Sequence, residues 1–523
     1  MDADAEVVLP HLKSSTYSSS ASHHDPSSPP QDLALVRTQS IAQTLSTLHE
    51  TLVIALLCST QFITQVSLLN TLNILPLISQ SLHITNIGVE AWLIAGYSLT
   101  VGTFILLSGR CGDVFGYKIM IVIGFVWAAI WNVVAGCSVF VNGHGNGGQV
   151  LFILARVFSG IGPAILLPNA LGLLGASYNP GRKKDMVFSL FGSCAPGGAV
   201  VGGTSAGLWS LIWWPWTFWT FGITLLVLAA LSALILPSVP LSREVQSLSF
   251  KQRLQELDLL GAAVGITAMI LFNFAWNQAP GFGWSKVYIY VLLIVGIFLF
   301  PVFFWIELKA AKKPLVPFDA LTTDVSFVLV CEMCGWAAFG IFVYYFISFL
   351  QNIRGTSPLL TMAQICPVAI SGFLAAITTG HIISRIGPAW VMLIAMCAFA
   401  TGLVLVATMP ADQNYWKQAF VVTLIIPWGM DMSFPAGTLI MSDAVPKRHQ
   451  GMAASLVNTV VNYSISIGVC IAGTVEVHVK GSGASKEDVL KGYRAALYLG
   501  VGLSSLGIAT SLLFLYKKHV RRF

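Results

Sequence analysis

Three ionisable side chains stand inside long apolar segments of the sequence, namely Arg156, Glu332 and Asp431. An ionisable group in such a segment costs several kcal/mol unless it faces a cavity or meets a partner. Asp431 stands between Pro427 and Pro435, which interrupt helices and free backbone carbonyls. We therefore expect Asp431 to bind a proton or a cation, unless it only links neighbouring helices by hydrogen bonds. Glu332 stands early enough in its segment to reach water.

Amide side chains recur in three other apolar segments at spacings that place each set on one face of a helix. Amides that line a cavity can bind a small hydroxylated or aminated solute, whereas amides between helices form interhelical hydrogen bonds. Both interpretations stay open for these residues. The candidates are Gln61, Gln65 and Asn73, then Asn273 and Asn277 beside Trp276, and then Asn458 and Asn462 with Ser466.

Enzymatic chemistry finds little support in the sequence. No H-E-x-x-H metal motif and no G-x-x-x-x-G-K-[ST] phosphate loop occurs. The ten histidines fall in the N-terminal tail, in loops or at loop edges. Cys331 and Cys334 form a C-x-x-C pair inside an apolar segment, where packing explains them better than metal or redox chemistry. We expect no enzymatic activity, no cofactor and no metal site.

The composition fits a chain solvated by lipid. Of its 523 residues, 55% are hydrophobic and only 10% are charged, and the mean hydropathy is +0.77. A soluble protein carries about 25% charged residues, so this chain has too few polar groups to cover a water-exposed surface. The net charge of +6 comes from basic residues in short loops, where lipid headgroups explain it better than nucleic acid.

Apolar runs of about 20 residues, the length that crosses a bilayer as a helix, recur from Thr51 onward. Because helices satisfy their own backbone hydrogen bonds, we expect an all-α polytopic membrane protein with about fourteen transmembrane helices. The predicted spans are 51–78, 89–108, 119–140, 150–177, 186–208, 213–236, 258–278, 287–306, 323–349, 358–379, 389–409, 417–443, 452–474 and 494–516.

These spans form two groups of six with a pair between them. We predict an N-terminal six-helix bundle over 51–236, an inserted helix pair over 258–306 and a C-terminal six-helix bundle over 323–516, with loops over 237–257 and 307–322. Segments 1–50 and 517–523 are predicted tails, the first disordered because it is rich in Ser, His and Pro. Most of the 28 Lys and Arg fall on the side of the N-terminus, so the positive-inside rule places both termini in the cytoplasm.

Two short loops share a pattern and are each the second loop of a six-span group. One is the segment GRCGDVFGYK over 109–118, and the other is GHIISRIG over 380–387. Gly109 aligns with Gly380 and Gly116 with Gly387, at the same spacing in both. A very short turn between helices needs glycine for positive φ and close backbone approach. The shared placement indicates an internal duplication, as in facilitator-type transporters built from six-span repeats.

The first of these loops resembles the signature loop of the major facilitator superfamily. Gly109, Arg110, Asp113, Gly116 and Lys118 stand at matching positions. In that family the loop gates the cytoplasmic side, and the resemblance implies the same role here. The sequence departs from the signature at position 114, where a valine replaces the usual arginine.

Two further segments resemble motifs of the family's fourteen-span drug:proton antiporters. The run that begins at Arg156 is similar to the R-x-x-x-G-x-G-x-A pattern, which implies a role for this arginine in proton transfer. Gly198, Gly202 and Gly203 resemble the antiporter G-P-x-x-G-G pattern, with Ala199 in place of the proline. Small residues at this spacing also allow close packing of helices.

Four other segments resemble fungal aminotriazole-resistance and boron-efflux permeases, a group that also includes low-affinity ammonium permeases. They are 271–280, 429–435, 451–464 and 491–494. The resemblance implies a plasma-membrane transporter that exports small toxic solutes. We expect it to work by alternating access as a monomer, with the bilayer, a small molecule and coupling protons as its partners. The alternative is a facilitative or cation-coupled permease for a small solute such as ammonium. The absence of an aspartate near Gln65, where this branch often carries one, favours that alternative.

Overall fold

The computed structural model describes residues 45–141, 146–179, 181–241, 243–311, 314–316, 322–444, 450–481, 483 and 485–520. Fourteen helices in this described part are long and apolar enough to cross a membrane. This finding confirms the predicted all-α polytopic fold with fourteen spans. The predicted tail 1–50 lies outside the described residues except for 45–50, and the tail 517–523 is described only to residue 520.

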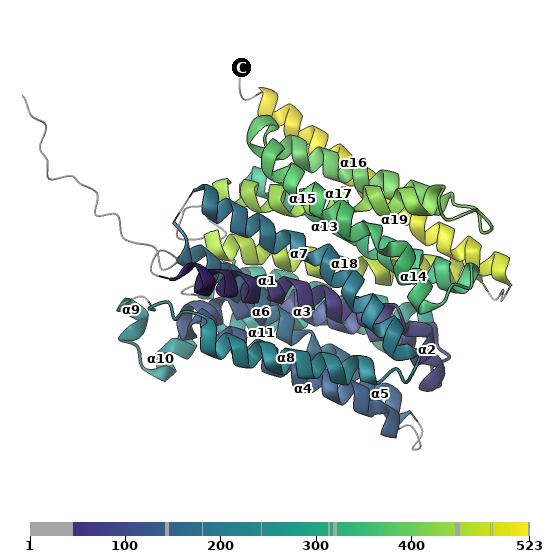
Figure 1. Cartoon of the computed structure of the whole chain (residues 1–523), viewed down its shortest axis with the longest axis horizontal. Helices are drawn as coiled ribbons and strands as arrows, with labels where there is room; N and C mark the ends of the chain where they lie inside the picture. Colours follow the sequence, from purple (N-terminus) through teal and green to yellow (C-terminus); the bar gives the residue numbers. More distant parts are fainter. Residues whose placement is uncertain are drawn as a thin grey trace, which may run out of the picture. The chain divides into compact units, whose positions relative to one another are not determined.

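The spanning helices run beside one another, with α9 and α10 drawn at the left and α2 and α14 at the right of Figure 1. The first six spans are α1 (Thr47–Leu72), α3 (Ile87–Phe115), α4 (Tyr117–Cys137), α5 (Gly147–Ser159) with α6 (Ile161–Ser177), α7 (Arg182–Ser210) and α8 (Trp216–Ile235). The next two are α11 (Leu259–Phe282) and α12 (Val287–Trp305). The last six are α13 (Thr323–Ser348), α14 (Pro358–Ile365) with α15 (Pro367–Ile386), α16 (Pro388–Ala407), α17 (Gln418–Ala444), α18 (Gln450–Lys480) and α19 (Lys486–Val520).

Several short helices join or extend these spans. They are α2 (Leu75–Ser81), η3 (Ser138–Val141), α9 (Arg243–Gln246), α10 (Phe250–Gln255), η4 (Ile306–Ala310) and η6 (Phe349–Ile353). The predicted first span 51–78 is therefore too long, since α1 ends at Leu72 and Pro76 opens the separate helix α2. The predicted span 358–379 is two helices, because Pro367 begins α15 after α14 has ended.

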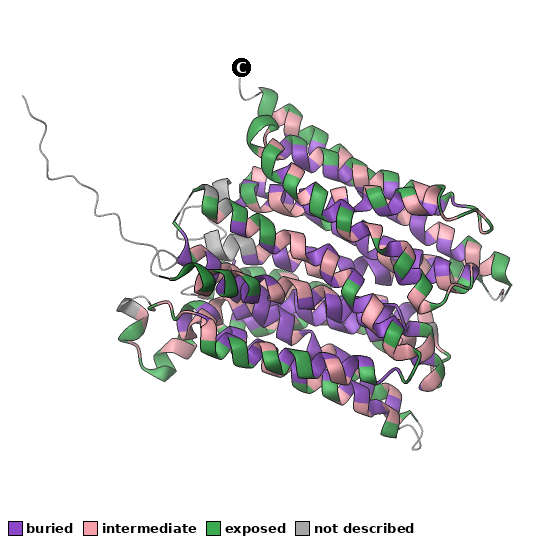
Figure 2. Ribbon diagram, in the orientation of Figure 1, coloured by how far each residue is buried: buried purple, intermediate pink, exposed green. Residues whose placement is uncertain are grey.

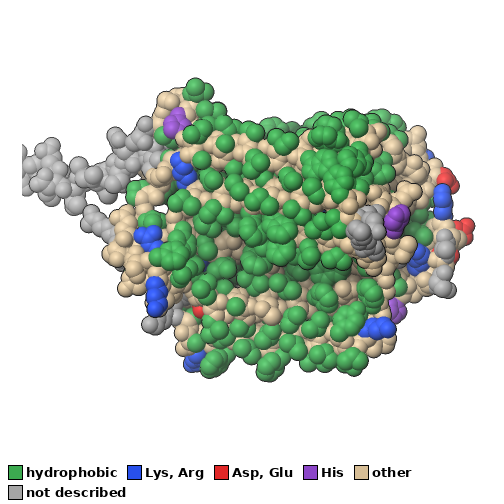
Figure 3. All heavy atoms as spheres, turned by 90° about the horizontal axis from the view of Figure 1, so that it is seen from below, with side chains coloured by type: hydrophobic (Ala, Val, Ile, Leu, Met, Phe, Trp, Pro, Cys, Tyr) green, Lys and Arg blue, Asp and Glu red, His purple; other side chains and the backbone are tan. Residues whose placement is uncertain are grey.

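The outer surface of the described residues is apolar, as a lipid solvent requires. Figure 3 shows hydrophobic side chains over the middle of one face, with Lys, Arg, Asp and Glu near its two ends. Buried residues lie mostly toward the centre of the bundle and exposed ones on its outside (Figure 2). Helix α12 is the least buried of the described spans. Its Phe298 side chain is 67% exposed and its Trp305 side chain is 63% exposed.

Single glycines make the two predicted repeat loops. Gly116 ends α3 and opens α4 with φ 100°, and Gly387 ends α15 and opens α16 with φ 86°. Both turns lie at the same end of the bundle, which we call the glycine-turn end; we call the opposite end the Asn73 end. The loops are shorter than predicted, because α3 runs on to Phe115 and α15 to Ile386.

Helices of the first six spans meet helices of the last six in backbone contact along two seams. In seam A, α3 packs on α18: a Cβ atom added at Gly102 would lie 2.7 Å from the backbone nitrogen of Tyr463. In seam B, α7 packs on α14 and α15: a Cβ atom added at Gly207 would lie 3.2 Å from the Cα of Leu359. The internal repeat relates the two seams. Gly109 of α3 approaches Ser455 of α18 in seam A, and its counterpart Gly380 of α15 approaches Ser189 of α7 in seam B.

The inserted helix α11 lies against seam A and contacts both α3 and α18. The Tyr463 hydroxyl of α18 donates to the Met269 carbonyl of α11 at 2.9 Å. The Asn86 side chain, which caps α3, donates to the Gly281 carbonyl at 3.2 Å. Helix α12 packs on α11, so the inserted pair attaches to the bundle chiefly through α11.

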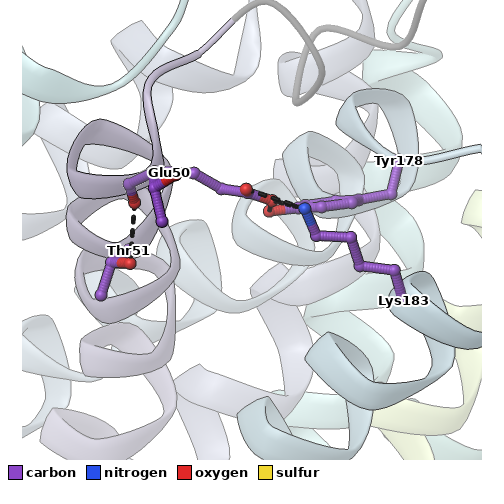
Figure 4. Close-up of polar contacts among 5 residues, drawn as sticks. Glu50, Thr51, Tyr178 and Lys183 are labelled. Atoms are coloured by element: carbon purple, nitrogen blue, oxygen red, sulfur yellow. Dashed lines mark hydrogen bonds and ion pairs between the residues drawn. The ribbon is translucent and has the colours of Figure 1, made fainter.

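A polar cluster at the glycine-turn end ties the start of α1 to its neighbours (Figure 4). The Glu50 carboxylate accepts from the Tyr178 hydroxyl at 2.9 Å and pairs with Lys183 at 2.7 Å. Burial, together with the Glu50 carboxylate, raises the pKa of Tyr178 above its ordinary value, so the phenol stays a donor. His49 contacts the Ile235 carbonyl at 2.7 Å, which adds α8 to the cluster.

Replacing Gly116 with alanine should destabilise the protein by about 1–3 kcal/mol, because its backbone conformation is one that residues with a Cβ rarely adopt. No atom lies within 4 Å of the added Cβ, so the cost is conformational. The melting temperature of the purified chain measures the effect. Gly192→Ala is the matched control: the site is equally open but lies inside α7, and alanine favours helix. Equal melting temperatures for the two variants would contradict the argument.

Candidate functional site

Arg156 is fully buried in the last turn of α5 and binds two neighbouring helices. Its guanidinium donates to the Ser67 carbonyl of α1 at 2.8 Å, to the Ser67 hydroxyl at 3.3 Å and to the Leu93 carbonyl of α3 at 3.4 Å. The Tyr97 ring lies 4.6 Å from the guanidinium carbon. Carbonyl oxygens and an aromatic ring therefore stabilise this cation, and no carboxylate among the described residues forms an ion pair with it.

Asp431 lies on α17 beside seam B. Its side chain is 7% exposed, and Oδ2 has no hydrogen-bond partner among the described residues. A Cβ atom added at Gly372 of α15 would lie 2.8 Å from this oxygen and 2.5 Å from Cγ of Pro196 of α7. The carboxyl group therefore lies next to the contact between the first six and the last six spans.

The expectation that prolines break the helix around Asp431 is wrong. Helix α17 runs from Gln418 to Ala444 with Pro427 and Pro435 inside it. Packing against neighbouring helices holds a proline-containing helix together in a membrane protein. Each proline still lacks an N–H group, so the carbonyl four residues earlier loses its helical donor. For Pro435 that carbonyl belongs to Asp431 itself.

A second buried carboxyl group, that of Glu332 on α13, also contacts α17. It lies on α13 and is fully buried, so it does not reach water as the sequence suggests, and neither carboxyl oxygen has a hydrogen-bond partner in the described part. A Cβ atom added at Gly437 of α17 would clash with Oε1 of Glu332. Two buried carboxyl groups therefore lie along α17, its own Asp431 and Glu332 of α13.

Asn73 joins both sets of spans at its end of the bundle. Its side-chain amide donates to the Gly203 carbonyl of α7 at 2.8 Å and to the Pro358 carbonyl of α14 at 3.1 Å. Gln351 of η6 donates to the backbone and side-chain oxygens of Asn73 at 2.7 and 3.0 Å. We call these four residues the Asn73 latch. For Asn73, interhelical hydrogen bonding is therefore the structural role.

The other amides do not converge on one site. Asn273 of α11 donates to the Ser466 hydroxyl of α18 at 3.0 Å, which in turn contacts the Ala95 carbonyl of α3 at 3.3 Å. Asn462 donates to the Asn458 carbonyl within its own helix at 2.9 Å. Both amide atoms of Asn277 are buried without a partner among the described residues. Gln61 and Gln65 are only partly buried on α1.

The predicted gate residues lie around Gly116 at the glycine-turn end. Arg110 and Asp113 are within the last turns of α3, 4.0 Å apart, and the Tyr117 hydroxyl donates to Asp113 at 2.8 Å. Lys118 lies in the first turn of α4 and is partly buried. The signature segment is thus mostly helix, and its charged side chains surround a turn of one residue.

The glycines of the antiporter-like pattern pack against α1 and across seam B. Gly198 approaches the Phe62 backbone and Gly202 the Val66 backbone of α1, while Gly203 faces Met362 of α14. The stretch 203–207 has the G-x-S-x-G spacing of serine hydrolases. It lies inside α7, and the Ser205 hydroxyl donates to the Gly202 carbonyl at 2.9 Å. A nucleophile in that motif needs a sharp strand-to-helix turn, so this segment packs helices.

Sequence reasoning missed a cavity of about 270 Å³ at the Asn73 end. It lies between α1, α2 and α3 on one side and α13, η6, α18 and α19 on the other, and we call it the vestibule. Glu90 and Glu476 line it, and Gln351 of the latch belongs to its wall. Both glutamates lie at the edges of the apolar runs, where the sequence alone does not distinguish an acidic residue of a helix from one of a loop. The extension of α18 to Lys480, beyond the predicted end at 474, is what brings Glu476 into the bundle.

Comparison with known proteins identifies the family. The sequence model of the Major Facilitator Superfamily matches residues 57–468 and 325–522, so the chain belongs to this superfamily of transporters. The fold agrees: the peptide transporter POT in complex with sulfate aligns with a TM-score of 0.59 at 14% identity, over 88% of this chain and 94% of that one.

Curated relatives are similar over nearly the whole chain. The Low affinity ammonium transporter of Saccharomyces cerevisiae is 51% identical over 465 residues, which is 88% of each chain. Efflux pump terJ of Aspergillus terreus is 43% identical over 94% of this chain and 92% of its own. The Aminotriazole resistance protein of Saccharomyces cerevisiae is 36% identical over 88% and 83%. These relatives confirm the predicted resemblance, and the chain is a secondary transporter rather than an enzyme.

Replacing Arg156 with lysine should destabilise the protein by about 2 kcal/mol or more, since lysine keeps the charge but loses the planar fork that reaches both Ser67 and Leu93. Thermal unfolding of the purified chain measures this. Arg385→Lys makes the same change at an exposed position of α15 and should leave the melting temperature unchanged. Equal stability of Arg156→Lys and the native chain would show that the fork contacts contribute nothing.

Proposed function

We propose that this transporter exports small toxic solutes, such as boric acid, aminotriazole-like compounds and drugs, in exchange for protons. The observation that carries the proposal is Asp431, a buried carboxyl group at seam B whose Oδ2 has no hydrogen-bond donor among the described residues. Ionising it in this packed arrangement leaves an uncompensated charge, which costs several kcal/mol. Opening the seam to water removes that cost, so release of the proton is linked to opening.

This linkage supplies the coupling step that a proton antiporter needs. Alternating access in this fold moves one six-span bundle against the other. A proton on Asp431 favours the closed seam, and its loss favours the open one. A pH difference between the two sides can therefore bias which way the seams open, because each state binds the proton with a different affinity.

We assign the glycine-turn end to the cytoplasm and the Asn73 end to the cell exterior at the plasma membrane. Basic residues concentrate in the segments at the glycine-turn end, and the positive-inside rule places such segments in the cytoplasm. In this orientation the residues around Gly116 form the inner gate and the Asn73 latch the outer one. We expect the monomer to be the working unit.

Relatives that carry the words efflux pump or resistance in their names, at 43% and 36% identity, support export. A second candidate function is uptake of a small cation, favoured by the 51% identity to the Low affinity ammonium transporter. The two candidates predict opposite effects of expression on a sensitive strain, which separates them directly.

Replacing Asp431 with asparagine should abolish the stimulation of export by a pH gradient while leaving exchange at equal pH intact. The isosteric amide keeps the packing at seam B but carries no titratable proton. Proteoliposomes loaded with aminotriazole or boric acid, with and without an imposed gradient, provide the measurement. Asp412→Asn, the same change at an exposed loop position, is the control. Undiminished gradient stimulation in Asp431→Asn would exclude this carboxyl as the coupling site.

Expression in a transporter-deficient fungal strain should lower its internal boron or aminotriazole and improve growth under challenge, since export removes the solute. Cellular solute content and growth are the readouts, with the Asp431→Asn variant, which should not export against a concentration gradient, as the control. Unchanged content together with increased methylammonium uptake would replace the export proposal with the cation-uptake alternative.

A further inference from the structure

The vestibule differs from the rest of the space between the two sets of spans because it is open and polar. Elsewhere along the seams, glycines bring the backbones into contact. At the Asn73 end a cavity of about 270 Å³ remains, which is enough for a small solute, and it receives side chains from both sets of spans. Glu90 comes from α3 of the first set, and Glu476 comes from α18 of the last set.

The two carboxylates keep unused acceptor capacity. Glu90 accepts one hydrogen bond from the Ser79 hydroxyl at 3.0 Å, and Glu476 accepts one from the Tyr345 hydroxyl at 2.8 Å. An ionised carboxylate offers about four acceptor positions, so most positions on each group are open to another donor. Glu476 is only 6% exposed, and a carboxylate this deeply buried needs further donors or a cation to offset its lost hydration.

Aromatic rings complete the lining. Tyr344 and Tyr493 both face the cavity, and the Tyr493 hydroxyl already accepts from the Asn352 side chain at 2.9 Å. Rings beside a cation stabilise it through their negative faces. Two carboxylates and two tyrosines around one cavity are the groups that recognise a protonated amine.

Two lysines also line the vestibule, and their charge opposes that of the two glutamates. Lys480 stands one helical turn beyond Glu476 on α18 and is partly exposed, while Lys486 at the start of α19 is exposed. Charges in contact with solvent are screened more than buried ones, so the buried Glu476 carboxylate outweighs the exposed Lys486 inside the cavity. The lysines weaken cation binding there but do not reverse it.

We propose that the vestibule binds solutes that carry a protonated amine, held between Glu90 and Glu476. This assignment deepens the proposed transport function, on which it rests, by naming a binding station at the outer end for those exported solutes that carry an amine; boric acid carries none and is not bound there. Such a ligand bridges α3 and α18, which belong to opposite sets of spans. Since Gln351 of the latch lies in the same wall, an occupied vestibule favours the closed arrangement of this end.

Equilibrium binding of radiolabelled methylammonium to the purified full-length chain in lipid nanodiscs tests the proposal. Glu90→Gln and Glu476→Gln should each weaken binding about tenfold, because each removes one charge-assisted contact. Lys480→Gln should strengthen binding severalfold, since it removes a repelling charge. Glu487→Gln, which changes an exposed charge next to Lys486, should bind as the native chain does.

The opposite signs at Glu476 and Lys480 distinguish ligand binding from a loss of folding, which would weaken binding in every variant. Melting temperatures equal to the native value confirm that the glutamine variants are folded. Native affinity in both glutamine variants, or no binding to the native chain at millimolar methylammonium, would overturn the assignment. Asp431→Asn should retain binding while losing gradient-driven transport, so failure of the vestibule and failure of proton coupling give different results.

Discussion

Backbone contact between helices of the two sets of spans is the constraint on which the rest of the structure depends. In a bilayer, apolar side chains gain little by leaving lipid, so helices associate through close packing and hydrogen bonds. Gly102 in seam A and Gly207 in seam B allow that approach, and a side chain at either position would meet the partner backbone. The contacts at these glycines are van der Waals contacts, and side chains add hydrogen bonds across the two sets of spans, such as Ser466 to the Ala95 carbonyl and Asn73 to the Pro358 carbonyl.

Polar groups lie at both ends of the bundle and beside seam B, where their contacts change if the seams open. The Asn73 latch joins the two sets of spans at one end through backbone carbonyls, and Arg110 and Asp113 flank the one-residue turn at the other. Asp431 lies between them beside seam B, close to Gly372 of α15, which itself lies against Pro196 of α7. Arg156 differs, because its partners all belong to the first six spans. It stabilises the packing of α1, α3 and α5 whichever way the seams open.

The sequence alone could predict the spans and the two glycine turns, because both follow from local rules. A run of 20 apolar residues crosses lipid as an α-helix. A one-residue turn between two helices needs a glycine such as Gly116. It could not predict the partners of Asn73 or the surroundings of Asp431, which depend on helices more than 100 residues apart in the chain. Glu476 escaped notice because hydropathy marks where apolar residues end, whereas α18 continues for another turn and a half to Lys480. Glu90 stands at the first residues of a predicted span, where nothing in the sequence shows that it faces a cavity.

The inserted pair makes the two seams unequal. Helix α11 contacts both α3 and α18 and binds each through a hydrogen bond to its backbone, from Asn86 and from Tyr463. Separating α3 from α18 must therefore also detach one of them from α11. By contrast, α7 and α15 meet through Gly372 and Pro196 beside the Asp431 carboxyl group, whose Oδ2 has no partner in the described part of the chain. Seam A is reinforced, and seam B carries the titratable group. A duplicated fold with this insertion is no longer symmetric in energy, so one seam can serve as the hinge while the other responds to the proton.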